Sequence, residues 1–360
     1  MKQLINKTQK GHLLLFLACL SLFASCRKDM IFPVASGRPY EVLVVMDSVT
    51  WKSPTGRALF NVLDTDVPGL PQSERSFRIS RIEPKEMDHA FSIFRNIIHV
   101  DINKQLYSQA RMKFMRNKSA MEQIVLTINA PTEEEFRKFC EDHRQDIVDF
   151  LTKMEMNRLI EELKTKYSKC TNDLAWQVLQ CRMYAPKELT SYKKGKDFIW
   201  TSNNTASGLE NICIYSYPYE GPETFNKTYI LHKRDSIMEK NLPGERPGMY
   251  MQTDTLCTTV RPIVVHGMYA MEARGLWVMK NDFMGGPFVS HSRVDVENNR
   301  VVVVEGFVYA PEKMKRGLIR RLEGSLYTLQ LPEEQEILEI KPDIEEEQKS
   351  QNTEQVTKQE

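Results

Sequence analysis

The chain has 360 residues, with 49 Lys and Arg against 48 Asp and Glu, and a formal net charge of +1. Apolar residues make up 41% and aromatic residues 9%, which excludes a wholly disordered chain and is enough for one large domain or two. The balanced charge argues against a nucleic-acid partner, because proteins that bind nucleic acid carry a basic excess or stripe.

An export signal is predicted at the start of the chain. Three lysines within the first ten residues precede an apolar run of 12 residues, 13–24. That run is too short to span a membrane as a helix and has the length of a signal-peptide core. No later segment reaches spanning length, so we expect no transmembrane helix in the mature protein.

The residues Phe23-Ala24-Ser25-Cys26 follow, and they resemble the lipobox of bacterial lipoproteins. In those signals the cysteine sulfur takes a diacylglycerol, and cleavage leaves that cysteine as the N-terminus. We therefore predict a signal peptide over 1–25, lipidation of Cys26, and a tether over 26–38. An ordinary cleaved signal with an incidental cysteine is the alternative.

Residues 39–170 are expected to form an N-terminal α/β lobe. An apolar run over 40–47 reads as a buried strand, and Ser53-Pro54 caps a helix over 56–63. Strands are further expected over 76–82, Asn96–Ile102, 110–115 and 123–129, the last two as a hairpin, with a short helix over 85–91. Thr132 then opens one long helix that continues to about Lys166.

Residues 171–331 are expected to form a C-terminal α+β lobe. Strands are predicted over 176–184, 197–201 and 211–217, and a helix over 225–240. Four strands with short turns then follow, over 262–272, 276–280, 288–296 and Arg300–Tyr309, before a closing helix over 314–326. Connections that short join only antiparallel neighbours, so these four strands predict a meander.

The fold class is therefore α+β, with mixed and antiparallel sheets and packed helices. The predicted strands that end at Asn129 and at Tyr309 are each followed by an Ala-Pro dipeptide and then a helix. Two related α/β lobes are thus an alternative within this class. From Pro332 on there are ten acids and three lysines, which predicts an acidic, disordered tail over 332–360.

The cysteine pattern offers no metal site. Loss of Cys19 with the signal and lipidation of Cys26 leave five cysteines, so at least one thiol stays free. Cys170 and Cys181 are close enough in sequence to pair, and buried free thiols are the alternative. No Cys or His pair has the spacing of a structural zinc site, and we expect no metal and no cofactor.

Two clusters are candidate binding sites. His291 and Arg293, with Asp295, fall on one face of a predicted strand and could bind an anion or shuttle a proton. An ordinary salt-bridged strand face explains them equally well.

The second cluster is aromatic. Alternation places Tyr215, Tyr217 and Tyr219 on one strand face, with Trp200 on a neighbouring strand, where they could stack on sugar rings. Packing of a half-buried sheet is the alternative. Motifs of serine hydrolases, P-loop enzymes and zinc proteases are absent, so no catalytic residue is assigned.

Several motifs together resemble a family of Bacteroidota lipoproteins catalogued as domain of unknown function 4837. They are Gly37-Arg38-Pro39-Tyr40-Glu41-Val42-Leu43-Val44-Val45, Leu70-Pro71-Gln72-Ser73-Glu74, Arg95-Asn96-Ile97-Ile98, Gly285-Gly286-Pro287-Phe288 and Phe307-Val308-Tyr309-Ala310-Pro311, spread over most of 35–330. The resemblance implies a location in the cell envelope and no assigned activity.

Surface-exposed lipoproteins of these bacteria resemble one another in having several acids after the lipidated cysteine, whereas Cys26 is followed by Arg27-Lys28 and the single acid Asp29. We therefore expect attachment to the outer membrane, with the inner membrane as the alternative, and a periplasm-facing body.

These observations favour a non-catalytic binding module in the periplasm. Its partners would be the membrane, through the N-terminal lipid, and an envelope protein or glycan. The alternative is an envelope hydrolase acting on glycan or peptide, with a site that assembles only in three dimensions.

Overall fold

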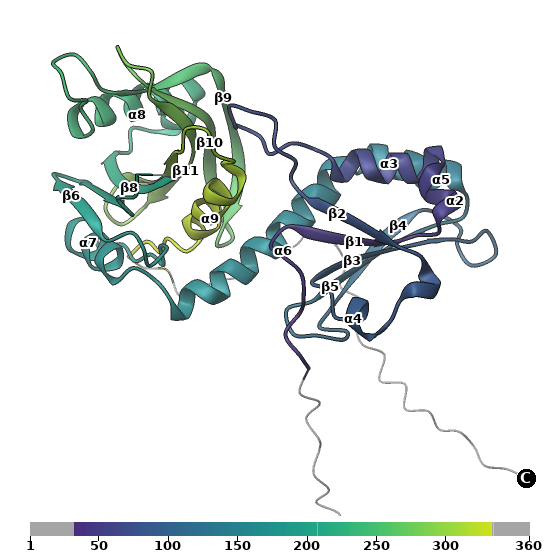
Figure 1. Cartoon of the computed structure of the whole chain (residues 1–360). Coiled ribbons are helices and arrows are strands. Elements are labelled where there is room, and N and C mark those ends of the chain that lie inside the picture. Colours follow the sequence, from purple (N-terminus) through teal and green to yellow (C-terminus); the bar gives the residue numbers. More distant parts are fainter. Residues whose placement is uncertain (1–31, 207, 333, 335–360) are drawn as a thin grey trace, which may run out of the picture. The chain divides into compact units, whose positions relative to one another are not determined.

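The computed structural model describes residues 32–206, 208–332 and 334. Within them, an N-terminal sheet of five strands has the order β2-β1-β3-β5-β4 (Figure 1). The strands are β1 (Glu41–Val45), β2 (Arg78–Ile82), β3 (Asn96–Ile102), β4 (Arg111–Arg116) and β5 (Ile124–Ala130). β1 is parallel to β2 and β3, β3 is parallel to β5, and β4 is antiparallel to β5. We call this sheet and its helices the N-terminal lobe.

The N-terminal sheet is covered on both faces, as expected of mainly parallel strands. Its helices are α2 (Ser48–Lys52), α3 (Pro54–Leu63), α4 (His89–Ser92), α5 (Glu133–Asp142) and α6 (Arg144–Thr165), with a 3₁₀ turn at Pro84–Glu86. Val42 and Val44 of β1 pack with α3, α5 and α6. Leu43 and Val45, which alternate with them, pack with Phe91 of α4.

The predicted long helix from Thr132 is two helices. α5 ends at His143, whose φ of −108° and ψ of 23° leave the helical range. Its Nδ1 lies 2.8 Å from Asp146 Oδ2 in the first turn of α6. The apolar periodicity hides this break, because Phe136 of α5 and Ile147 of α6 face the same core.

The C-terminal sheet has seven antiparallel strands in the order β6-β7-β8-β12-β11-β10-β9 within the described residues. They are β6 (Ser191–Gly195), β7 (Phe198–Ser202), β8 (Leu209–Pro218), β9 (Met251–Val265), β10 (Met268–Met279), β11 (Gly285–Asp295) and β12 (Arg300–Tyr309). We call this sheet and its helices the C-terminal lobe. The α+β class is thus confirmed. The two sheets differ in topology, so the repeated Ala-Pro segment is a local device and the lobes are not related copies.

Helices cover both faces of the C-terminal sheet. α7 (Lys169–Leu179) and α9 (Arg316–Leu326) pack on one face, against Ile212 and Val304 among others. α8 (Lys227–Asn241), which follows a 3₁₀ turn at Pro222–Phe225, packs on the other face, against Tyr215 and Val303.

The strand predicted over 176–184 is wrong, because α7 occupies most of it. The Ser168 hydroxyl accepts from the Thr171 amide and caps the helix, and Gln180 ends it in the left-handed conformation with a φ of 57°. Leu174, Ala175 and Leu179 are buried at helical spacing. The strand prediction arose because apolar residues at the end of α7 and just after it lie close together in the sequence.

The strand predicted over 262–272 is also wrong, because it crosses a turn. His266 and Gly267 both have positive φ, 53° and 77°, as a two-residue hairpin turn requires. The sequence also predicts a turn between the strands over 262–272 and 276–280. The structure has no turn there: Arg274 lies within β10, whose pairing with β9 shifts register between Arg274 and Leu276. The turn of the β9–β10 hairpin is therefore His266-Gly267.

Contacts between α6 and α9 bring the two lobes together. A Cβ at Gly324 of α9 would lie 2.7 Å from Leu159 Cδ2 of α6, so a larger residue at this position would have to displace the Leu159 side chain. The Glu74 carboxylate accepts from the amides of Lys315, at 2.7 Å, and Arg316, at 2.8 Å, at the start of α9. Within the described residues no helix is both long and apolar enough to cross a membrane.

Candidate ligand-binding site

A cavity of about 940 Å³ lies between α6, the β9–β10 hairpin and α9. α6 contributes the apolar side chains of Val148, Met156 and Ile160. The edge strand β9 contributes Thr259 and Arg261 among others. A cavity of this size, with both apolar and charged walls, is the default candidate for a ligand site.

A chain of ion pairs forms the charged wall. Glu272 Oε1 of β10 accepts from Arg261 Nε at 2.9 Å, and Glu272 Oε2 accepts from Arg274 Nη2 at 3.2 Å. Arg274 Nη2 also donates to Glu323 of α9, whose second oxygen accepts from Arg320 Nη1 at 3.0 Å. Apart from Arg261, all of these side chains are buried.

The ion pairs keep the wall charged. Burial raises the pKa of Glu272, but Arg274 and Arg261 outweigh it and hold the pKa of this carboxyl well below its usual range. Burial lowers the pKa of Arg274, and its two glutamate partners outweigh this and raise it. General acid–base catalysis needs a group that gains and loses a proton near neutral pH. Neither Glu272 nor Arg274 is such a group.

His291 lies behind this wall and is fully buried. Its Nε2 is 3.9 Å from Glu272 Oε2, and its ring is 4.7 Å from the ring of Tyr327, which lines the cavity. Neither ring nitrogen has a hydrogen-bond partner among the described residues. Burial lowers the pKa of His291 to about 4, so the ring is neutral at neutral pH.

The predicted anion-binding strand face is occupied by the protein itself. Arg293 Nη1 donates to Leu329 O at 3.1 Å and to Glu334 Oε2 at 3.0 Å. Asp295 Oδ2 accepts from Arg300 Nε at 2.8 Å. Arg293 and Asp295 are almost fully buried, so the structure does not bring these side chains together on an open surface.

Glu334 belongs to the folded body, although the sequence assigns it to the acidic tail. His266 Nδ1 lies 3.3 Å from its carboxylate, and the Leu331 amide donates to it at 3.0 Å. Burial raises the pKa of Glu334, but the hydrogen bonds from His266 and Arg293 outweigh it and lower the pKa to about 2. The rest of the predicted tail, from 335 on, and Cys26 lie outside the described residues.

The aromatic cluster forms part of the core under α8. Tyr215 is 2% exposed and Tyr217 is 8% exposed, while Tyr219 is half-buried. Tyr217 contacts the Tyr229 ring of α8 at 6.2 Å between centroids. Because they are buried, Tyr215 and Tyr217 have a packing role in this sheet. This is the alternative to sugar stacking that the sequence analysis gives.

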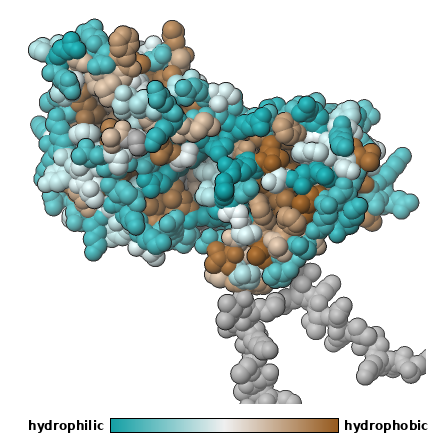
Figure 2. Space-filling model, in the orientation of Figure 1, coloured by the Kyte–Doolittle hydropathy of each residue, from teal (hydrophilic) through white to brown (hydrophobic). Residues whose placement is uncertain are grey.

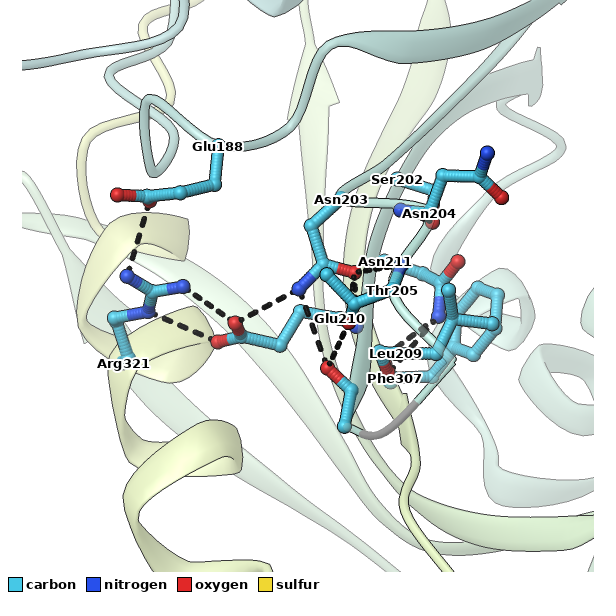
Figure 3. A network of polar contacts seen from close by, with 11 residues as sticks. Glu188, Ser202, Asn203, Asn204, Thr205, Leu209, Glu210, Asn211, Phe307 and Arg321 are labelled. Atoms are coloured by element: carbon cyan, nitrogen blue, oxygen red, sulfur yellow. Dashed lines mark hydrogen bonds and ion pairs between the residues drawn. The ribbon is translucent and has the colours of Figure 1, made fainter.

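A second polar network holds α9 in place (Figure 3). Arg321 of α9 donates through Nε to Glu210 Oε1 of β8 at 2.9 Å, and through Nη1 to Glu188 Oε2 at 3.1 Å. Asn203, before β8, donates to Glu210 Oε2 at 3.3 Å and accepts from the Glu210 amide at 3.1 Å. These bonds attach α9 to the sheet, and α9 contributes Arg320 and Glu323 to the cavity wall.

The charged wall was not predicted from the sequence. A charged pair inside the run Met271-Glu272-Ala273-Arg274, and Arg320 three residues before Glu323, were the available signals. The assignment of Arg274 to a turn concealed the first of them.

The five described cysteines are all free, so Cys170 and Cys181 do not pair. Cys181 is buried, and burial raises its pKa to about 12. No group of three His, Cys, Asp or Glu side chains that could hold a metal occurs in the described part of the chain.

Comparison with known families separates the two lobes. Residues 169–328 match the model of a domain of unknown function (DUF4837), and residues 35–164 match that of a second domain of unknown function (DUF8532). The sequence resemblance to the first family spanned most of 35–330, whereas its model matches only the later part. No similarity to a curated protein or to a solved structure was found. The chain is thus similar to two families of domains of unknown function, DUF8532 in its N-terminal part and DUF4837 in its C-terminal part.

Proposed function

We propose that this protein is a lipid-anchored envelope protein that binds a ligand, without transforming it, in the cavity between α6, the β9–β10 hairpin and α9. The observation that carries the binding function is that the buried glutamates of the cavity wall form ion pairs with arginines. Glu272 and Glu323 are each held by two arginines, so neither is placed to act as a general acid or base. Asp66, Asp149 and His266 also line the cavity, so hydrolysis by one of these groups is the alternative that the mass of a retained ligand tests.

The envelope location rests on the N-terminal sequence. The apolar run followed by Ala24-Ser25-Cys26 supports lipidation, and Arg27-Lys28 supports a body that faces the periplasm. Attachment to the outer membrane is the location that we propose. Proteinase K added to intact cells should then leave the protein whole, and its digestion without loss of periplasmic control proteins would place it on the surface.

The lining favours a ligand with both polar and apolar parts. Val148, Met156 and Ile160 offer an apolar wall, while Arg261 is more than half exposed and can meet a polar group. Envelope glycans and peptides carry both kinds of group, and an envelope protein could present the same groups on a loop. We therefore expect a glycan or peptide fragment of the envelope as the ligand.

A blocking variant tests the site. Thr259 is exposed on β9 and lines the cavity, so Thr259→Trp should block it without disturbing the core. Thr255→Trp, at an exposed position of the same strand that does not line the cavity, is the matched control. Peptidoglycan fragments and short oligosaccharides would be screened by thermal shift against both variants and the wild-type protein.

At least one fragment class should raise the melting temperature of the wild-type protein and of Thr255→Trp, but not of Thr259→Trp, because a ligand that binds only the folded state stabilises it. Equal shifts for all three proteins, or none for any fragment, would count against a ligand site in this cavity.

A further inference from the structure

An exposed apolar patch lies where the described chain begins. Val34 is 68% exposed and Met121 is 51% exposed, and the two residues form a β-bridge. The partly exposed Ile93 and Phe94 lie beside them, because the Ser36 amide donates to Ile93 O at 2.9 Å and Ser36 bridges Phe94. We call Val34, Ile93, Phe94 and Met121 the anchor-side patch.

The anchor-side patch is a fixed surface. The Ala35 backbone amide donates to Met121 O at 3.0 Å, and Nε2 of the buried Gln123 side chain donates to Phe94 O at 2.8 Å. Gly37 has a φ of +97°, and a Cβ there would lie 3.1 Å from the Phe94 ring. The glycine therefore lets the chain run close over this ring, and the apolar side chains keep defined positions.

Figure 2 shows hydrophobic side chains at the lower edge of the N-terminal lobe in this view, among hydrophilic ones. Close to Met121 in the sequence, the exposed charges are of both signs, Lys118 before it and Glu122 directly after it. A mixed rim neither repels nor strongly attracts anionic lipid. The contact that such a patch offers a membrane is therefore mainly apolar.

The sequence places this patch close to the proposed lipid. Val34 follows Cys26 by eight residues, so it lies within about 28 Å of the acylated cysteine even if the chain between them is fully extended. The segment from Met30 to Val34 contains no charge, while Arg27 and Lys28 adjoin the cysteine. Basic residues next to an acyl anchor suit anionic headgroups.

We propose that the anchor-side patch rests on the membrane that holds Cys26, with Val34 and Met121 inserted at the level of the headgroups. This inference rests on the lipidation of Cys26 proposed above. A lipid surface is the partner that fits best, because the anchor brings the patch and the membrane together at high local concentration. Burial of the patch would add an apolar contact and restrict the orientation of the body on the membrane.

The test places a fluorophore on the patch. The lipidated protein would carry Met121→Cys in a Cys257→Ser background, which removes the one exposed native thiol among the described residues. The labelled protein would be reconstituted into phosphatidylethanolamine–phosphatidylglycerol vesicles that contain a spin-labelled quencher lipid. Leu256→Cys in the same background is the control, because Leu256 is 95% exposed and lies on β9 in the C-terminal lobe. The unsubstituted background reports labelling of the remaining thiols.

We expect the quencher lipid to reduce the fluorescence at position 121 about twofold and to leave position 256 unchanged, because only a group at the headgroup level meets the quencher. A fluorophore on Val34→Cys should behave like that at 121, which guards against a local effect of either substitution. Equal quenching at 121 and 256 would overturn the docking.

Mass spectrometry of the N-terminal peptide separates the two failures. A diacylglycerol on Cys26 together with equal quenching would refute the docking and leave the anchor intact. Absence of the lipid would refute both.

Discussion

Glu272 and Arg274 stand two residues apart on β10, so their side chains share one face of the sheet and meet. Glu323 reaches the same guanidinium from α9. The three side chains are buried, and Arg274 is the partner that both glutamates share. Two of the partners are 49 residues apart in the chain, so this arrangement could not be predicted from the local sequence pattern.

Removal of the central arginine should be costly. Arg274→Met would leave two buried carboxylates without their shared partner, and we expect a loss of about 3–5 kcal/mol in the free energy of unfolding. Arg261→Met, which removes a partner that is half exposed, should cost about 1 kcal/mol or less. Urea denaturation measures both. Equal losses for the two variants would contradict the central position of Arg274.

His291 should make the fold sensitive to acid. Its pKa is lowered from 6.5 to about 4, so between these values the unfolded chain binds a proton that the folded chain does not. Stability should therefore fall by up to about 3 kcal/mol as the pH drops from 6.5 to 4. Glu272, Glu323, Arg274 and Arg293 act electrostatically on the same ring, and all four side chains are retained in His291→Gln.

His291→Gln should remove this part of the pH dependence. Denaturant unfolding of both proteins at several pH values checks the expectation. A slope between pH 6.5 and 4 that is the same in the two proteins would mean that His291 is not the group responsible.

Among the elements, those with buried β-branched runs were the most predictable. β3 and β12 were predicted with their observed bounds, because each contains a run of buried β-branched residues, Ile97-Ile98 in β3 and Val301–Val304 in β12. α7 was missed because its capping residues, Ser168 and Gln180, lie outside the apolar run. The end of β9 was missed because the turn signal His266-Gly267 is short, and the Gly275 that suggested a turn marks an irregularity within β10.

Gly275 of β10 leaves no room for a side chain against β9. A Cβ there would lie 2.2 Å from Thr258 Oγ1 and 2.6 Å from Thr258 Cα of β9, so Gly275→Ala must push the two strands apart. We expect a loss of about 2 kcal/mol or more in the free energy of unfolding. Gly317→Ala in α9 is the control, because nothing lies within 4 Å of its Cβ and alanine favours a helix by about 1 kcal/mol. Thermal unfolding should separate the two variants, and equal destabilisation would contradict the close strand approach.

At the scale of the whole molecule, we propose that the chain divides into its two lobes between Thr165 and Ser168, where α6 ends and α7 begins. The class of fold could be anticipated from alternating strands and helices followed by a meander. The cavity could not, because its walls come from α6, β9 and α9, which are brought together by the approach at Gly324 and the cap at Glu74.

The end of the folded body can be located by truncation. A chain that ends after Pro342 retains Glu334 and its bonds to Arg293 and His266, and its melting temperature should stay within about 2 °C of the full chain. A chain that ends after Leu331 loses those bonds, and its melting temperature should fall by several degrees. Similar values for the two truncations would show that Glu334 contributes nothing to stability.

Membrane attachment is predicted to depend on one sulfur. Cys26→Ala should release the protein from membranes or leave its signal peptide uncleaved, because the thioether to diacylglycerol cannot form. Cell fractionation and electrophoretic mobility report both effects. A variant that fractionates and migrates like the wild-type protein would refute the lipid anchor.

The proposal that the cavity binds a ligand without transforming it is tested most directly by equilibrium dialysis against envelope glycan and peptide fragments, followed by mass spectrometry of what the protein retains. The wild-type protein and Thr255→Trp should retain a fragment of unchanged mass, and Thr259→Trp should not. Recovery of fragments split by the addition of water, or equal retention by all three proteins, would contradict the account.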